Sequence, residues 1–261
     1  MLKLIRCECK KLKRKKLLLF VALAACLFPI PLSMLVIHED TGADYAFAYV
    51  FKLLEVIGTP IMLPIVIGFI AATLFFMERE NDTLKSLLIV PIFPAQLAFA
   101  KIIVLFIFGV LYALVTAAAA MLGGVIAGGA LTNIGQMLWV ACITGLCYTA
   151  ATLPFVILIV LFRRSYLFSM LATVIFGLAN YSSVWSGMTL IDTNQVLSAG
   201  QRVLLATPGC LILRWQLHYF TDVSPNVEPF VLSIWVLLAI MLAIAVVSYL
   251  FISIFFRRWQ N

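Results

Sequence analysis

Charged residues are scarce in this chain, and their scarcity argues against a water-soluble fold. Asp, Glu, Lys and Arg make up 11% of the 261 residues, whereas a soluble domain has about a quarter. Apolar residues make up 64%, and a soluble fold of this length cannot bury that much apolar surface. The apolar residues form long runs instead of alternating with polar ones, which excludes a transmembrane β-barrel. The sequence therefore predicts an all-α membrane protein.

Recognised catalytic motifs are missing as well. The chain has no Gly-x-x-x-x-Gly-Lys-Ser/Thr phosphate loop, no His-Glu-x-x-His pair and no Gly-x-Ser-x-Gly turn. Acidic residues are almost absent from the apolar runs, although proton- and sodium-coupled carriers normally keep ionisable residues there. We therefore expect no catalytic residues, no bound metal and no cofactor in this chain.

Cysteine gives no evidence for a disulfide or a zinc site. Of the six cysteines, Cys7 and Cys9 form the closest pair. Zinc requires four ligands, and both histidines, His38 and His218, fall on the other side of the predicted membrane. Cys210 is the one cysteine in the predicted outer segments, so an outer disulfide within the chain has no second cysteine.

Six apolar runs are long enough to cross a bilayer, since a spanning helix needs about 20 residues. They are Leu17–Ile37, Val56–Met77, Leu97–Ala127, Ile134–Phe162, Tyr166–Leu190 and Phe230–Phe256. The first run should be a retained anchor and not a cleaved signal peptide, because no small-residue cleavage site follows it. We expect residues 1–261 to form a single transmembrane domain of six helices.

Lysine and arginine predict the orientation of these spans. With the N-terminus in the cytoplasm, 15 of the 18 basic residues fall in cytoplasmic segments, and only Lys52, Arg202 and Arg214 fall outside. Such an excess on the cytoplasmic side is the rule for membrane proteins. Glu55 is among the acidic residues predicted outside, in the segment 38–55. We expect both termini in the cytoplasm, localisation to a bacterial cytoplasmic (inner) membrane, and no nucleic-acid partner for the net charge of +7.

The basic N-terminal segment, residues 1–16, carries Leu2, Ile5 and Cys9 at helical spacing. Two interpretations stay open. The segment is an amphipathic helix on the inner leaflet, with its basic side toward anionic lipid headgroups, or it is a basic anchor that only fixes orientation.

Residues 78–94 form the most informative cytoplasmic segment. Polar residues cluster at its start, and Leu84, Leu87 and Leu88 follow at helical spacing before Pro91 and Pro94 end the pattern. The pattern predicts a short amphipathic helix at the inner membrane surface, between the second and third spans. The alternative is a plain hairpin loop.

Two features lie toward the predicted outer side. In residues 191–229, two apolar pieces too short to span flank Thr207-Pro208-Gly209, which predicts a helical hairpin that re-enters the outer leaflet; an amphipathic outer cap is the alternative. In the fifth span, a polar patch must face the protein interior. Helix–helix hydrogen bonding is its default interpretation, and lining of a substrate pathway is its candidate function. The patch consists of Asn180, Ser182, Ser183 and Ser186.

The spacing in the inner segment resembles that of a known family. The chain resembles the permease subunits of ABC-2 type ABC transporters. The resemblance lies in a basic N-terminus, an apolar outer segment, and the spacing of Glu78, Asn81, Lys85, Leu87-Leu88, Pro91 and Lys101. The resemblance is greatest to the group that acts in bacitracin resistance and lantibiotic immunity. The similarity in architecture extends over the whole chain, whereas the motif covers about two dozen residues.

This resemblance implies partners and roles. It implies an ABC ATPase on a separate chain, which binds ATP and Mg, and a second permease copy or paralogue. Residues 78–94 would be the coupling helix, and residues 199–216 would be the outer re-entrant helices. The cargo would be a peptide antibiotic. The residues implied in coupling are Glu78, Arg79, Glu80, Asn81, Asp82, Thr83, Lys85 and Pro91.

Three other functions compete with this one. The chain could be a non-transporting sensor or assembly subunit, an intramembrane enzyme, or an ABC-2 exporter of another amphipathic cargo. A sensor would need no ATPase contact at Glu78, Glu80 and Lys85. An enzyme would need the polar residues of the fifth span to converge at one depth.

Overall fold

The structure, a computed structural model, is helical throughout the residues that it describes. These are residues 2–14, 17–38, 46–80, 94–126, 132–161, 166–192, 198–220 and 227–257. The elements are α1 (Leu2–Arg14), α2 (Leu17–Leu27), α3 (Pro29–His38), α4 (Ala46–Leu53), the π-helix η1 (Leu54–Gly58), α5 (Thr59–Glu80), α7 (Pro94–Ile126), α8 (Ile134–Leu161), α9 (Tyr166–Asp192), α10 (Ala199–Leu205), α11 (Pro208–Phe220), the 3₁₀ turn η2 (Glu228–Phe230) and α12 (Ile234–Arg257).

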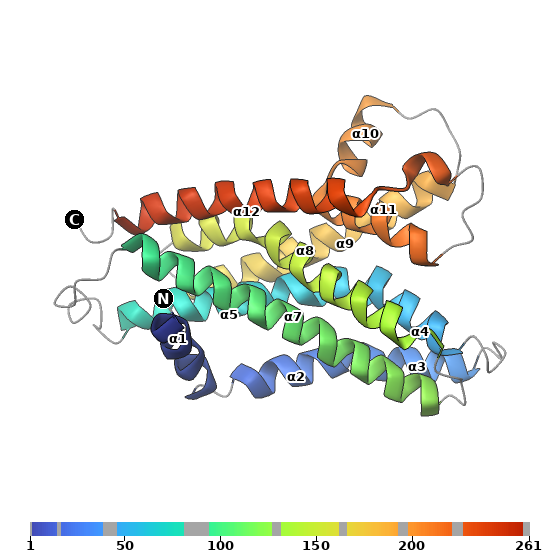
Figure 1. Cartoon of the computed structure of the whole chain (residues 1–261), viewed down its shortest axis with the longest axis horizontal. Coiled ribbons are helices and arrows are strands. Elements are labelled where there is room, and N and C mark those ends of the chain that lie inside the picture. Colours follow the sequence, from blue (N-terminus) through green and yellow to red (C-terminus); the bar gives the residue numbers. More distant parts are fainter. Residues whose placement is uncertain are drawn as a thin grey trace.

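The long helices run side by side in one bundle (Figure 1). α8 lies at its centre and α12 on its outside: 72% of the most apolar part of α8 is buried in the protein, against 22% for α9 and 11% for α12. α12 exposes a row of large apolar side chains, as expected of a helix that faces lipid or a second protein chain. The row consists of Trp235, Leu242, Val246, Val247, Leu250, Phe251 and Ile254.

Small residues bring α7 and α8 close together. A Cβ atom added to Gly145 would lie 2.9 Å from the backbone oxygen of Gly109, and one added to Gly109 would collide with the hydroxyl of Thr149. Glycine at both positions therefore lets the two backbones touch, as in other close helix pairs in membranes. Gly124 plays the same part between α7 and α4, since a Cβ there would lie 3.0 Å from the Cα of Phe47.

Among the described residues, five helices are each long and apolar enough to span a membrane, where six spans were predicted. The first predicted span, 17–37, is divided into α2 and α3, which meet at Phe28. Pro29 and Pro31 explain the division, because neither has an N–H for a helical hydrogen bond and their rings clash with the preceding turn. α3 starts anew with the bond from Leu32 N to Phe28 O, 3.2 Å long. Both halves pack against α7.

The second span begins about ten residues earlier than predicted. Helix runs without a gap from Ala46 through η1 to Glu80, and its apolar stretch covers Phe47–Phe76. Residues 46–55, predicted to lie in an outer segment, therefore belong to the bundle. The π-turn precedes Pro60, whose ring would clash with the carbonyl of Val56 in a regular helix, and the wider turn relieves that clash.

The bundle has two distinct ends. Figure 1 shows the N- and C-termini, the end of α5 and the start of α7 at one end, and α4, α10 and α11 at the other. In the predicted topology both termini and the 78–94 segment share the cytoplasmic side, and this orientation stays a prediction. We call these the inner and outer ends, following the predicted orientation.

The predicted outer hairpin takes the form of two helices. α10 and α11 are separated by Ala206 and Thr207, and Ser198 and Gln201 form a capping box at the start of α10. α11 begins at Pro208, where a missing N–H costs no helical bond. It packs against α8, α9 and α12, so the second apolar piece is buried against longer helices, whereas Val203 in the first piece is 71% exposed. Re-entry into a leaflet stays a prediction.

Candidate functional site

A buried polar cluster lies at the outer end. Glu55, in η1, has 3% of its surface exposed. Its Oε2 accepts a hydrogen bond of 2.8 Å from Nε2 of Gln216 on α11. The same nitrogen donates to Oγ1 of Thr144 on α8 over 3.1 Å. Gln216 and Thr144 are also buried. The Gln216 side chain therefore joins the hairpin helix α11 to α8 and to the 46–80 helix.

Tyr148 adds a buried hydroxyl to this cluster. It follows Thr144 by one helical turn and so lies on the same face of α8. The Tyr148 side chain is buried, and its Oη has no hydrogen-bond partner among the described residues. An unsatisfied buried hydroxyl costs about 1–3 kcal/mol. The site thus contains one more hydrogen-bond donor than it uses.

Sequence reasoning placed Glu55 wrongly, in an outer segment. The signal that could have found it is the run of apolar residues that starts at Phe47, well before Glu55. Lys52 and Glu55 interrupt that run and made it look like a loop. A charged residue three positions after another, inside an otherwise apolar helix, is a mark of a polar site within a membrane protein.

The predicted patch on α9 contacts its neighbours through Asn180. Its Nδ2 donates to Pro60 O over 3.0 Å. That carbonyl is left without its helical partner because Pro64, four residues on, has no N–H. Asn180 also lies against α11, where a Cβ on Gly209 would come within 2.5 Å of Asn180 Oδ1.

The serines of the patch bond mainly within their own helix. The hydroxyls of Ser182 and Ser183 donate to Ala179 O and Asn180 O, and Ser186 O accepts from Thr189. The backbone oxygen of Ser183 also accepts from the thiol of Cys210 on α11 at 3.1 Å. Only the Cys210–Ser183 and Asn180–Pro60 bonds among these contacts join different helices, and a role for the four residues in a pathway stays a prediction.

A second polar cluster lies at the inner end, where α1 meets α7. Lys101 is fully buried; its Nζ lies 2.6 Å from Leu74 O, 3.4 Å from Glu8 Oε2 and 5.3 Å from the centre of the Phe75 ring. Glu8 is 2% exposed and also bonds Lys11 at 2.5 Å. The cluster fastens α1 to α7 and to the end of α5.

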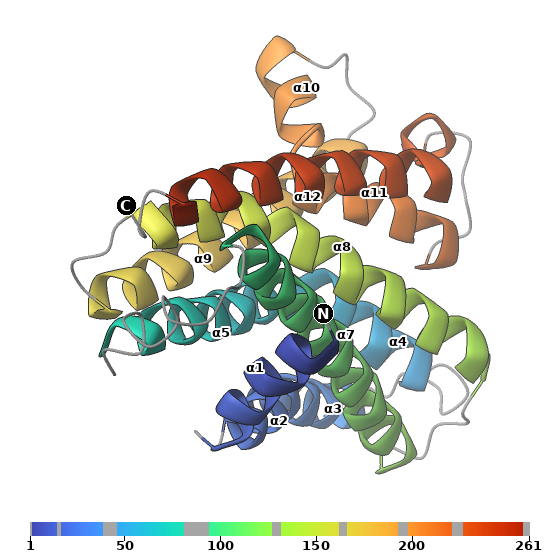
Figure 2. The ribbon, with the colours of Figure 1, turned by 60° about the vertical axis from the view of Figure 1, so that its left-hand side comes forward.

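The helix α1 has one buried and one exposed side, and its predicted place on the inner leaflet stays a prediction. Leu12 and Glu8 are buried toward the bundle, whereas Lys3, Arg6, Lys10 and Lys13 are exposed. Figure 2 shows α1 against α7, with α2 close by. Leu2, one of the apolar residues in the predicted stripe, is 83% exposed, so its end of the helix has apolar surface left for lipid.

The position of Cys9 yields a test of this docking. Burial raises the pKa of the Cys9 thiol above its ordinary value, and the negative charge of Glu8 raises it further. A raised pKa leaves less of the reactive thiolate at a given pH. We expect alkylation at pH 8 to modify Cys9 more slowly than the exposed Cys7, as followed by peptide mass spectrometry. Equal rates at the two thiols would mean that α1 is undocked in solution.

The predicted coupling residues are described only in part. Glu78, Arg79 and Glu80 form the last turn of α5, and their backbone is helical. Asn81, Asp82, Thr83, Lys85 and Pro91 lie outside the described residues, so the predicted helix within 78–94 stays a prediction. For a metal, the described part of the chain offers no group of three or more His, Cys, Asp or Glu side chains.

Comparison with known proteins assigns the family. Residues 4–180 match the family described as "ABC-2 family transporter protein". A search of curated protein sequences found no match to the chain. The matched region runs from α1, through the inner cluster and Glu55, to Asn180 on α9, and it covers well over half of the chain. The chain therefore belongs to the ABC-2 transporter family, as a membrane permease component whose family associates with an ABC ATPase.

Proposed function

We propose that this permease removes or exports a peptide antibiotic of the bacitracin or lantibiotic type from the membrane, driven by an ABC ATPase on a separate chain that holds the ATP and Mg. The resemblance of the 78–101 spacing to that group supports the cargo. A membrane domain with so few buried charges also suits an amphipathic cargo that approaches through lipid. An ABC-2 exporter of another amphipathic cargo is the alternative within the family.

One observation carries the proposed mechanism: α5 joins the inner and outer clusters in one uninterrupted helix. It has 22 residues and is therefore about 33 Å long. Its inner end carries Glu78, Arg79 and Glu80, and its outer end continues into the π-turn that holds Glu55. A stiff helix moves as a rigid body, so a displacement at one end reaches the other.

At the inner end, residues 78–94 act as the coupling helix in this proposal. Eight residues of this segment either contact the ATPase or give the segment the shape with which it contacts the ATPase. They are Glu78, Arg79, Glu80, Asn81, Asp82, Thr83, Lys85 and Pro91. The Glu8–Lys101 contact supports this role, since it ties α1 to the start of α7 and the end of α5, the two helices that flank the segment. ATP-driven closure of the ATPase then moves these helices together.

At the outer end, movement of α5 changes the contact between Glu55 and Gln216. The hairpin helix α11 is held there by the Gln216 amide. When α11 shifts, Glu55 loses that donor and Tyr148 replaces it. Two alternative partners for one buried carboxyl group make the outer end bistable, which is what a gate requires.

A second permease copy completes the pathway in this proposal. α9 and α12 are the least buried of the long helices, which leaves apolar surface for a second protein chain. The polar side of α9, with Asn180, Ser182, Ser183 and Ser186, lies next to the hairpin that we assign to the gate. Cargo moves along this side of α9 when α11 opens.

Co-purification after mild detergent extraction tests the proposed function. We expect an ATPase with a phosphate-binding loop to come out of the membrane with this chain. Reversing Glu78→Lys, Glu80→Lys and Lys85→Glu together should abolish that association and leave the permease folded. The matched control reverses two exposed residues at the outer end, Arg202→Glu and Glu228→Lys, and should keep the ATPase bound.

Two results would contradict the assignment. A chain that is extracted alone under several mild conditions would favour a sensor, assembly subunit or intramembrane enzyme. A Glu78→Lys, Glu80→Lys double variant with an unchanged cargo-stimulated ATPase rate would show that the coupling surface lies elsewhere.

A further inference from the structure

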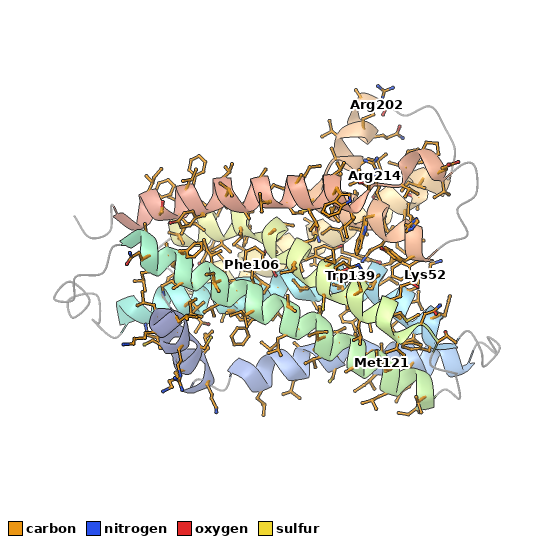
Figure 3. The ribbon with its side chains drawn as sticks, in the orientation of Figure 1. Lys52, Phe106, Met121, Trp139, Arg202 and Arg214 are labelled. Carbon is orange, nitrogen blue, oxygen red and sulfur yellow. The ribbon has the colours of Figure 1, made fainter. Side chains whose placement is uncertain are left out.

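Lys52 stands between two pockets at the outer end. The first, of about 550 Å³, lies between α4, the start of α8 and the end of α11, and polar groups of Tyr49, Thr132, Asn133 and Gln136 line it together with Lys52. The second, of about 310 Å³, lies between α4, η1 and α9. Figure 3 shows Lys52 at the outer end of the bundle, as are Arg202 and Arg214.

The two pockets differ in chemistry. The second is almost wholly apolar: beside Lys52 and Thr189, its walls are Leu53, Val56, Ile57, Trp185 and Met188. No acidic side chain of the described residues lines either pocket. A cation with hydrogen-bonding groups on one side and an apolar slot on the other suits a ligand with an anionic head and a hydrocarbon tail.

The depth of Lys52 matches the headgroup region of a bilayer. The apolar stretch Phe47–Phe76 has 30 residues and is therefore about 45 Å long, as long as a bilayer is thick when its headgroup regions are included. Lys52 lies about 8 Å from the start of this stretch, at the inner edge of the headgroup region. Trp185, half exposed on α9, is a residue type that gathers at the membrane interface. Val56 and Ile57 lie one turn deeper, at the level of acyl chains.

We propose that this pair of pockets binds one anionic phospholipid of the leaflet at the outer end. Its phosphate contacts the ammonium of Lys52 and the polar groups of the first pocket, and an acyl chain lies in the second pocket between η1 and α9. Because Tyr219 and Phe220 of α11 also line the first pocket, the bound headgroup touches the end of the hairpin. The site does not depend on the proposed cargo or on the ATPase.

Native mass spectrometry of the purified permease tests this site directly. The protein is stripped of lipid and offered phosphatidylglycerol or phosphatidylethanolamine. We expect one phosphatidylglycerol per chain to bind in preference to phosphatidylethanolamine, and Lys52→Gln to weaken it about fivefold, as for loss of one basic group at a membrane surface. Lys52→Arg should retain binding. Thr189→Trp, which fills the apolar pocket from an exposed position, should weaken binding although the charge remains.

Controls separate this site from general adhesion of lipid. Arg202→Gln removes an exposed outer cation that lines neither pocket and should leave binding unchanged. Equal binding of the two lipids, an unchanged Lys52→Gln variant, or an equal loss in Arg202→Gln would overturn the proposal. Displacement of the lipid by millimolar inorganic phosphate would also overturn it, since it would reveal a site for the anion alone.

Discussion

Replacing Glu8 by alanine is expected to destabilise the fold by about 3 kcal/mol, because it removes a carboxylate that lies beside the buried ammonium of Lys101. Lys101 has no exposed surface and lies 3.4 Å from Glu8 Oε2. Leu74 O and the Phe75 ring remain near Lys101 in the variant. Thermal unfolding of the detergent-solubilised permease should show a clearly lowered midpoint.

Limited proteolysis locates the effect of that variant. α1 carries Lys3, Arg6, Lys10 and Lys13 on its exposed side, so an undocked α1 should be cut by trypsin before the rest of the chain. Arg6→Gln, on the exposed face, is the matched control and should unfold like the wild type. Replacing both buried charges, Glu8→Leu with Lys101→Met, should recover most of the lost stability, since an apolar pair can substitute for a buried ion pair. A Glu8→Ala variant with unchanged stability would contradict the inner cluster.

Removing Glu55 is expected to have the second largest effect, about 2 kcal/mol for Glu55→Ala. The substitution takes one acceptor from the buried Gln216 amide and leaves a small cavity. Glu55→Gln keeps the size of the side chain and one hydrogen bond, and should cost about 1 kcal/mol or less. Hydrogen–deuterium exchange should show faster exchange in residues 208–220, because α11 loses part of its attachment.

Tyr148→Phe distinguishes a static cluster from a gate. In the resting fold the hydroxyl has no partner among the described residues, so its removal should leave stability equal to the wild type or slightly higher. If Glu55 exchanges Gln216 for Tyr148 during transport, turnover should fall while stability does not. For Glu55→Ala, the control is Glu228→Ala, which removes an exposed acid at the same end of the bundle. Unaltered hydrogen–deuterium exchange of α11 in Glu55→Ala would show that the hairpin is held by apolar packing alone.

The architecture was largely accessible from the sequence, because length and hydropathy determine spanning helices almost by themselves. The runs starting at Leu97, Ile134 and Tyr166 correspond to α7, α8 and α9 within a few residues. The break at Thr207-Pro208 was also predicted, since proline can start a helix but cannot continue one. For the same reason Pro29 and Pro31 divide the first span. That division depends only on neighbouring residues, so it could be predicted from the sequence.

The polar clusters were less accessible, because their partners are far apart in the chain. Glu8 and Lys101 are 93 residues apart, and Glu55 and Gln216 are 161 residues apart. Periodicity assigns each residue to a face of its helix, but it does not identify the helix that packs against that face. Glu55 was predicted in the outer segment 38–55, whereas the structure places it in a continuous helix. Asn180 could have been paired with α5 in principle, since Pro64 frees a carbonyl that some donor must satisfy.

The contact between Glu8 and Lys101 also constrains the order in which the protein is assembled during synthesis. α1 leaves the ribosome before α7, because Lys101 of its docking site is translated 93 residues after Glu8. While α1 is being made, Lys11, which bonds Glu8 in the fold, is the nearer partner and Lys101 does not yet exist. We expect α1 to dock only after α7 is inserted. The docking of α1 thus has to wait for α7, so it reports that α7 is in place.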